Sequence, residues 1–144
     1  MTKDFREFLQ CLNEQGVEYL LIGGHAVGYH GYPRATGDLD VWIAVHEENA
    51  RRTVSALRAF GFDLPNLLPD LFLRAHRIIR MGIEPNRIEI QTGISGVEFS
   101  QVYARRVVAL LDGISVNIIP LEDLKRNKKA SGRHKDLADL ENLP

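Results

Sequence analysis

The sequence predicts an α/β protein of the α+β type, with a mixed β-sheet flanked by helices in a single domain over residues 1–144. The length of 144 residues suits one domain, and no internal repeat or Gly/Ser/Pro-rich linker divides the chain. Segments with helical spacing and short apolar runs follow one another irregularly along the chain. Regular βαβ alternation would instead predict a doubly wound parallel sheet.

The composition excludes several classes of protein. Hydrophobic residues make up 44% of the chain and charged residues 26%, as in an ordinary globular protein. The net charge of −1 argues against a globally basic nucleic-acid binder. The lone cysteine, Cys11, excludes a disulfide framework, so a cytoplasmic location is expected. No apolar run approaches the ~18–20 residues that cross a bilayer, so no membrane partner is expected.

Helices are predicted from apolar residues at helical spacing and from capping residues. The first begins after Thr2, a suitable N-cap, and ends at Gly16. Its apolar face carries Phe5, Phe8, Leu9 and Leu12. Further helices are expected at residues 25–30, 47–60, 97–105, from Pro120 to a break at Gly132, and at 133–142.

Strands are predicted at residues 17–22, 38–45, 75–81 and 86–91, followed by a hairpin over 106–119 with its turn at Asp112-Gly113. No element is placed at 62–73. In 38–45 the odd positions are all apolar, whereas the even positions begin with two acids and continue with Trp42. Trp42 could stack on a base, but we expect it to belong to the core.

The two acids of this strand, Asp38 and Asp40, are the first candidate site residues. Because they are two apart on a strand, they share a face, where burying both carboxylates unpaired is costly. A hard cation such as Mg²⁺ or Mn²⁺, or Arg and Lys partners, would relieve their repulsion. From the tripeptide alone, an edge strand whose aspartates face water is the simpler explanation.

Glu89 is the candidate third acid, because it lies between Ile88 and Ile90 in a predicted strand. If that strand lies beside 38–45, Glu89 reaches the two aspartates; otherwise it is a solvent-facing strand residue. Gly23 and Gly24 follow an apolar strand and precede a short helix. Glycine lets phosphates approach the backbone, and a helix start offers N–H groups to an anion. The alternative is a plain tight turn.

A basic segment lies near the end of the chain. Residues 125–135 contain no acid and carry Lys125, Arg126, Lys128, Lys129, Arg133 and Lys135. This segment could hold a polyphosphate or a nucleic-acid backbone, or it could be a solvated helix face.

The motifs resemble the nucleotidyltransferase superfamily that includes DNA polymerase β. Its signature is an apolar residue, Gly and then Gly or Ser, followed after a spacer by Asp-apolar-Asp/Glu-apolar. Here Ile22-Gly23-Gly24 is followed, after thirteen residues, by Asp38-Leu39-Asp40-Val41. The segment GGHAVGYHGYPRATGDLDVW and the tail LEDLKRNKKASGRHKDLADLENL resemble small bacterial AbiEii-type nucleotidyltransferase-like proteins, over roughly residues 17–142.

The resemblance implies a metal centre made of three acids. Asp38 and Asp40 would hold divalent metal, and Glu89 would be the third carboxylate, so all three would be catalytic. The cofactor implied is Mg²⁺ or Mn²⁺.

The resemblance also implies a site for a nucleoside triphosphate. Gly23 and Gly24 would cradle the triphosphate, and Lys128 would bind phosphate. Lys135 belongs to an Arg-x-Lys-Asp step that the tail shares with these proteins. Arg34, in an Arg-x-Thr step before the acids, would touch phosphate or pair with one of the two aspartates; we expect the pairing.

Three functions follow from these features. The acid set favours a Mg²⁺-dependent nucleotidyltransferase that moves a nucleoside monophosphate from a nucleoside triphosphate to a hydroxyl of RNA, protein or a small molecule. The small size of the chain favours a non-catalytic protein of the same fold that binds nucleotide or a partner, for example in a toxin–antitoxin pair. A nucleic-acid binder that uses residues 125–135 would need no acids.

Overall fold

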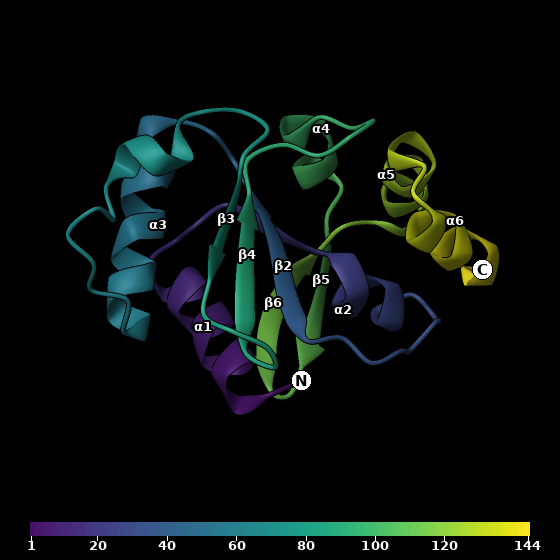
Figure 1. The fold of residues 1–144 in the computed structure, drawn as a ribbon, viewed down its shortest axis with the longest axis horizontal. Helices are drawn as coiled ribbons and strands as arrows, with labels where there is room; N and C mark the ends of the chain where they lie inside the picture. Colours follow the sequence, from purple (N-terminus) through teal and green to yellow (C-terminus); the bar gives the residue numbers. More distant parts are fainter.

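The computed structural model describes residues 1–144 and contains a six-stranded sheet in the order β3-β4-β2-β1-β6-β5 (Figure 1). The strands are β1 Tyr19–Ile22, β2 Asp38–Ile43, β3 Ile78–Met81, β4 Arg87–Gln91, β5 Val107–Leu111 and β6 Ile114–Ile118. β1 runs parallel to β6 and β2 parallel to β4, whereas the other neighbours are antiparallel. The predicted mixed sheet is therefore confirmed.

Helices cover both faces of this sheet. They are α1 Lys3–Glu14, α2 Gly23–Tyr29, α3 Glu47–Phe60, α4 Phe99–Ala104, α5 Leu121–Ser131 and α6 His134–Asn142. A short 3₁₀ helix, Pro69–Phe72, lies in the segment for which the sequence predicts no element. Figure 1 shows α1 and α3 on one side of the strands and α2, α4, α5 and α6 on the other. None of these helices has the length and apolar character needed to cross a membrane.

The helix boundaries follow from local chemistry. The Thr2 hydroxyl accepts the N–H of Phe5 at 3.1 Å, so it caps α1 as expected. α2 begins at Gly23 instead of His25, so both glycines lie inside the helix. Pro120 has an extended backbone and stands just before α5 as its N-cap, not within it.

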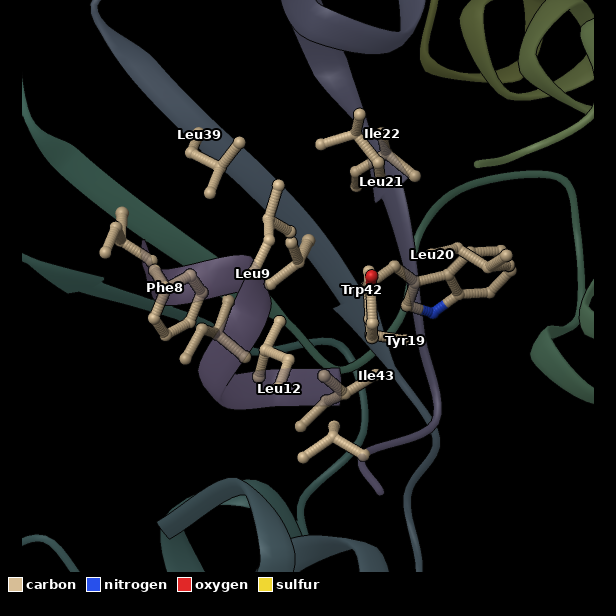
Figure 2. Packing of buried hydrophobic residues seen from close by; sticks show 14 of the residues in the cluster. Phe8, Leu9, Leu12, Tyr19, Leu20, Leu21, Ile22, Leu39, Trp42 and Ile43 are labelled. Atoms are coloured by element: carbon tan, nitrogen blue, oxygen red, sulfur yellow. The ribbon is translucent and has the colours of Figure 1, made fainter. Parts of the chain in front are cut away.

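The two faces of β2 have opposite chemistry. Leu39, Val41 and Ile43 are fully buried, as the alternation predicted. Figure 2 shows Leu39 and Ile43 beside the apolar residues of α1. On the opposite face Trp42 is only 2% exposed and meets Phe99 of α4 edge to face, with ring centroids 5.1 Å apart. Trp42 therefore belongs to the core, and the same face carries Asp38 and Asp40 at the start of the strand.

Asn49 connects α3 to the ends of β1 and β2. Its buried side chain accepts the N–H of Glu18 at 2.8 Å, and it donates to the carbonyls of Glu18 at 3.1 Å and of Ala44 at 2.9 Å. The Glu18 N–H and the Ala44 carbonyl thus bond to the Asn49 amide instead of a neighbouring strand, whereas the Glu18 carbonyl also accepts the Ala44 N–H at 3.2 Å. The Ala44 carbonyl is thereby diverted to α3, and β2 ends at Ile43, two residues before the predicted end.

Replacing Asn49 should weaken the fold markedly. In Asn49→Ala the Glu18 N–H and the Ala44 carbonyl lose their partner inside the protein, and the Glu18 carbonyl keeps only the Ala44 N–H. The free energy of unfolding should therefore fall by about 2–4 kcal/mol. Urea unfolding at neutral pH measures this change. Ser55→Ala, an exposed position on the same helix, should change it by no more than ~0.5 kcal/mol. Equal losses in the two variants would contradict the role of the Asn49 side chain.

Candidate functional site

A cavity of about 470 Å³ opens on the face of the sheet that carries the acids. Its volume falls in the range of roughly 300–1,000 Å³ that is typical of small-molecule sites. All eight residues that the sequence nominated line this cavity: Gly23, Gly24, Arg34, Asp38, Asp40, Glu89, Lys128 and Lys135. The structure therefore brings together residues from α2, the loop before β2, β2, β4 and the tail of the chain.

The parallel pairing of β2 with β4 decides which side chains meet. Asp40 stands opposite Glu89 in the register, and Asp38 stands opposite Arg87. Glu89 is only 12% exposed at its side chain, so it is not the solvent-facing strand residue of the alternative reading. Glu89 lies beside Asp40 because β4 pairs directly with β2, as expected for the strands at 86–91 and 38–45.

Asp40 and Glu89 form an interacting carboxyl pair. The pKa of Asp40 is raised to about 7, first by burial, then by its hydrogen bond with Glu89 and by the negative charges of Glu89 and Asp38; the positive charge of Lys135 partly offsets these effects. Two carboxyl groups hydrogen-bond only when one of them carries a proton. The Asp40 carboxyl therefore keeps its proton to a higher pH than an ordinary aspartate, because its raised pKa disfavours the charged form.

Gly23 makes room for the Asp40 carboxyl. Its backbone has a positive φ of 68°, and a Cβ added at this position would lie 2.2 Å from Oδ2 of Asp40. Any side chain at position 23 would therefore clash with the acid as well as strain the backbone. Gly24 is crowded in the same way, because a Cβ there would lie 2.9 Å from Oγ1 of Thr36. Gly23 thus keeps the α2 backbone close to the Asp40 carboxyl, and Gly24 keeps it close to Thr36 in the loop before β2.

Two arginines hold the outer acids. Arg87 donates from Nε and Nη2 to the two carboxylate oxygens of Asp38, at 2.9 and 3.0 Å. Arg80 of β3 donates from Nε to Glu89 at 2.8 Å. Bidentate pairs of this kind are among the stronger ion pairs of proteins. The Asp38 carboxylate is therefore already neutralised by a neighbouring strand.

The acids fit a divalent cation only in part. No group of three or more His, Cys, Asp or Glu side chains converges on one point in this structure. Asp38 is turned to Arg87, but Asp40 and Glu89 lie side by side and repel each other, and Mg²⁺ is commonly bound through one or two carboxylates. The donor chemistry of Asp40 and Glu89 thus suits a hard cation, with Asp38 outside the set.

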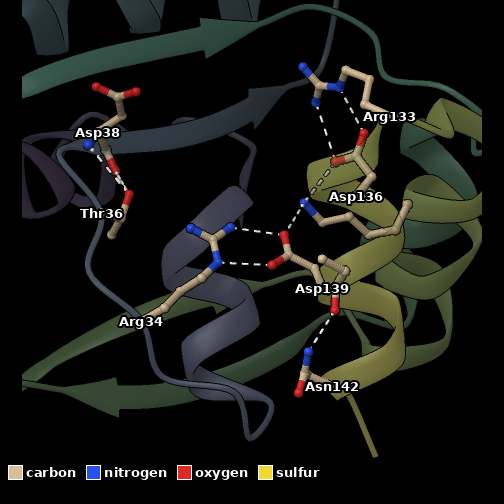
Figure 3. A network of polar contacts seen from close by, with 9 residues as sticks. Arg34, Thr36, Asp38, Arg133, Asp136, Asp139 and Asn142 are labelled. Atoms are coloured by element: carbon tan, nitrogen blue, oxygen red, sulfur yellow. Dashed lines mark hydrogen bonds and ion pairs between the residues drawn. The ribbon is translucent and has the colours of Figure 1, made fainter.

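Arg34 corrects one expectation. It does not pair with Asp38 or Asp40; instead it forms a bidentate ion pair with Asp139 of α6, with both N–O distances at 2.9 Å (Figure 3). The reason is that Arg87 already occupies Asp38, whereas the Asp139 side chain is 3% exposed and needs a cation. Arg34 thereby connects the loop before β2 to the tail helix.

Lys128 is also held inside the protein. It is 5% exposed, and its Nζ lies 3.2 Å from Asp136 and 3.1 Å from Asp139. Burial acts to raise the pKa of Asp136, but hydrogen bonds from Arg133 and Ser131 and the nearby Lys128 lower it to about 2. Figure 3 shows Asp136 and Asp139 at the centre of this network. The lysine that the resemblance assigns to phosphate is therefore shared between two buried aspartates.

The basic segment is not one continuous charged surface. Arg126 pairs with Asp123, Lys125 lies near Glu122, and Arg133 pairs with Asp136. Lys135, by contrast, forms no ion pair and lines the cavity, where its charge acts on Asp40. Lys135 is therefore the free cation of the cavity wall.

Sequence reasoning missed the partners of the predicted residues. Arg80, Arg87, Asp136 and Asp139 were not nominated, although each holds a residue that was. A signal existed for Arg87, which is two residues from Glu89 and therefore shares its strand face. The two aspartates of α6 resemble an ordinary exposed helix face, and only the tertiary structure shows them buried.

The raised pKa of Asp40 predicts a pH dependence of stability in protein kept free of metal with a chelator. Between its unfolded pKa of 3.8 and its folded pKa of about 7, the folded state holds the extra proton, so stability falls as pH rises through that window. Asp40→Asn cannot ionise, so at pH 8 it should be more stable than wild type, on the order of 2–4 kcal/mol, and close to wild type at pH 4.

Urea unfolding across this pH range measures the effect. Asp63→Asn, at an exposed carboxylate outside the cavity, should follow the wild-type curve. Parallel curves for wild type and Asp40→Asn would show that the Asp40 carboxyl is not perturbed.

Lys128→Met tests the buried charge network. The variant leaves Asp136 and Asp139 with one cation fewer, and removing one partner of a buried ion pair costs about 3–5 kcal/mol of unfolding free energy. Lys129→Met, at the adjacent exposed position, should have little effect. Thermal and urea unfolding of both variants measure the difference, and a Lys128→Met protein as stable as Lys129→Met would contradict the network.

Two solved structures share this fold. A protein from Thermotoga maritima that carries the provisional name nucleotidyltransferase superposes with a TM-score of 0.64 at 16% identity, over 95% of this chain and 88% of that one. An antigenic nucleotidyltransferase-like protein from Paracoccidioides brasiliensis superposes with a TM-score of 0.55 at 18% identity, over 96% of this chain and 73% of that one.

By sequence alone, no protein-family model matches the chain, and no curated protein is similar to it. At identities this low the structural likeness shows the fold and nothing finer. The chain is an α/β domain with a six-stranded mixed sheet flanked by helices, and its fold is nucleotidyltransferase-like.

Proposed function

We propose that this protein is a nucleotidyltransferase, dependent on Mg²⁺ or Mn²⁺, that transfers a nucleoside monophosphate from a nucleoside triphosphate to a hydroxyl of RNA, protein or a small molecule. One observation carries the proposal: Asp40, whose pKa is raised to about 7, and the adjacent Glu89 line a cavity of a nucleotidyltransferase-like fold together with the unpaired Lys135. The AbiEii-type relationship remains part of this proposal and rests on the sequence motifs.

The acids and bases of the cavity have separate roles in this proposal. Asp40 and Glu89 would hold the cation, which supplies charge neutralisation at the phosphate when bound. Asp38 joins them as the third ligand if it leaves Arg87. Asp40, whose pKa is raised to about 7, is also suited to accept the proton of an acceptor hydroxyl.

The phosphates would meet the basic wall of the cavity. Lys135 has no other ion pair and so is available to a triphosphate. Arg34 commits Nε and Nη2 to Asp139 but its Nη1 lies near Gly24, so that nitrogen remains for phosphate contact. Lys128 acts mainly through the positions of Asp136 and Asp139. Gly23 and Gly24 bring the α2 backbone close enough for phosphate to approach it.

A second function is favoured by the two arginines. Arg87 and Arg80 already neutralise Asp38 and Glu89, so the site is largely balanced in charge without a cation. A protein of this kind could bind nucleotide or a protein partner without catalysis, for example as one member of a toxin–antitoxin pair. The two functions differ in what the Asp40 carboxylate does.

Calorimetric titration of the four nucleoside triphosphates, each with and without Mg²⁺, separates the two. If the protein is a transferase, binding should need the metal and should weaken at least tenfold in Asp40→Asn, because one ligand of the cation is lost; a tenfold loss corresponds to ~1.4 kcal/mol. Asp63→Asn is the matched control and should bind as wild type does. Labelled triphosphate then reports transfer to acceptors.

The other outcomes are equally informative. Triphosphate binding that is unchanged in Asp40→Asn and without metal would identify a non-catalytic nucleotide-binding protein. No binding of any triphosphate, with Mg²⁺ present in millimolar excess, would contradict the proposal and direct attention to a protein partner.

A further inference from the structure

One edge of the sheet is left open by an apolar strand. β5, Val107–Leu111, is the last strand in the sheet order and has only β6 as a neighbour. Its sequence, VVALL, contains no charge and no proline, and its register with β6 runs without a bulge. Proteins commonly protect such edges with charges, prolines or bulges, because free edges pair with other strands. The opposite edge, β3, carries Arg80 and has only four residues.

The free backbone groups of β5 can be identified from the hairpin. A two-residue turn, Asp112-Gly113, makes Leu111 and Ile114 a hydrogen-bonded pair, and bonded and non-bonded pairs alternate from there. The N–H and C=O groups of Val108 and Leu110 therefore point away from β6. The residues opposite them on β6 show the same alternation. The Ser115 carbonyl accepts from the Asn13 side chain and the Asn117 N–H donates to the Tyr19 hydroxyl, so both groups point away from β5.

The side chains of these two residues are exposed as well. Val108 is 58% exposed and Leu110 is 77% exposed, although both are large and apolar. They lie on the same face of the sheet, since they are two apart on a strand. The open edge thus presents unpaired backbone groups and uncovered apolar side chains at the same two residues.

We propose that β5 pairs antiparallel with β5 of a second copy of this chain, about a two-fold axis at Ala109. In this register Val108 of each copy stands opposite Leu110 of the other, which matches outward-pointing backbone groups with one another. Val107 stands opposite Leu111. The two alanines meet at the axis in a non-bonded pair, where strands approach most closely and a small side chain fits. The result is one continuous sheet across both copies.

Charged residues at the two ends of β5 favour a second copy of this chain as the partner over an unrelated strand. The same register puts Arg106 of each copy opposite Asp112 of the other, so two opposite-charge pairs form by symmetry. Arg106 is exposed, lies over the Tyr103 ring at 4.1 Å and donates Nη1 to the Tyr103 carbonyl, which leaves further donors free. Asp112 is about half exposed and otherwise meets only the terminal amine of Met1, at 3.5 Å.

Other registers fit less well. A shift by two residues, the smallest that keeps outward groups facing one another, places Arg106 opposite Leu110 or Ile114. The ion pairs are then lost and the overlap becomes shorter. The dimer also leaves the candidate site accessible, because β6 and β1 separate β5 from β2 in the sheet.

Sedimentation velocity of the full chain, at concentrations up to the millimolar range, tests this interface. A single strand pair buries less than the roughly 1,200–2,000 Å² of standard interfaces, so we expect a monomer–dimer equilibrium that depends on concentration. Leu110→Lys puts a charge at the edge and should weaken dimerisation at least tenfold. Ile83→Lys is the matched control, because Ile83 is 82% exposed and lies beyond β3, near the other edge of the sheet.

A charge-swap experiment tests the register itself. Arg106→Asp and Asp112→Lys should each be monomeric alone, because like charges then face each other, and mixing the two should restore a heterodimer. If Asp112→Lys does not fold, a mixture of Arg106→Asp with wild type, which keeps only half of the ion pairs, should dimerise more weakly than wild type. A chain that stays monomeric at every concentration overturns the proposal. So does a dimer that survives Leu110→Lys, or one that Ile83→Lys disrupts equally.

Discussion

The parallel register between β2 and β4 is the constraint on which the candidate site depends. It sets Asp40 against Glu89 and, two residues earlier, Asp38 against Arg87. Two carboxyl groups with like charge thus stand opposite each other in one pair, and an acid stands opposite an arginine in the other. A slip of one residue would send every one of these side chains to the other face, which the apolar residues Leu39 and Val41 forbid because they are fully buried. The packing of the core therefore fixes which charged side chains face the site.

The tail of the chain is attached to this arrangement largely through charge. Asp136 and Asp139 are almost completely buried on α6 and are held by Lys128, Arg34 and Arg133. Buried carboxylates of this kind are tolerated only when paired, so each cation that holds them is committed to the fold. Fewer cations therefore remain free to bind a ligand than the basic segment 125–135 suggests. In the cavity, the free cation is Lys135.

The sequence predicted the elements better than the contacts between them. Periodicity located α3 at 47–60 and the hairpin turn at Asp112-Gly113, because both depend on neighbouring residues. The Arg34–Asp139 pair joins residues 105 positions apart, and no local pattern marks it. The roles expected for Arg34 and Lys128 rested on motif position, which does not show that buried aspartates compete for the same cations. Arg87 was within reach of prediction once the two strands were paired.

The distribution of neutralising groups over the three acids explains how one site could serve two chemistries. Asp38 has a guanidinium in two hydrogen bonds, and Glu89 has one in a single hydrogen bond. Asp40 has none, and its raised pKa favours the protonated carboxyl instead. A divalent cation and that proton compete for the same oxygens, so metal affinity must rise as the pH passes about 7. Recruiting Asp38 as a further ligand costs its bidentate pair with Arg87. The ion pairs of Arg80 and Arg87 therefore determine whether Glu89 and Asp38 stay neutralised by arginine or are free to bind a divalent cation.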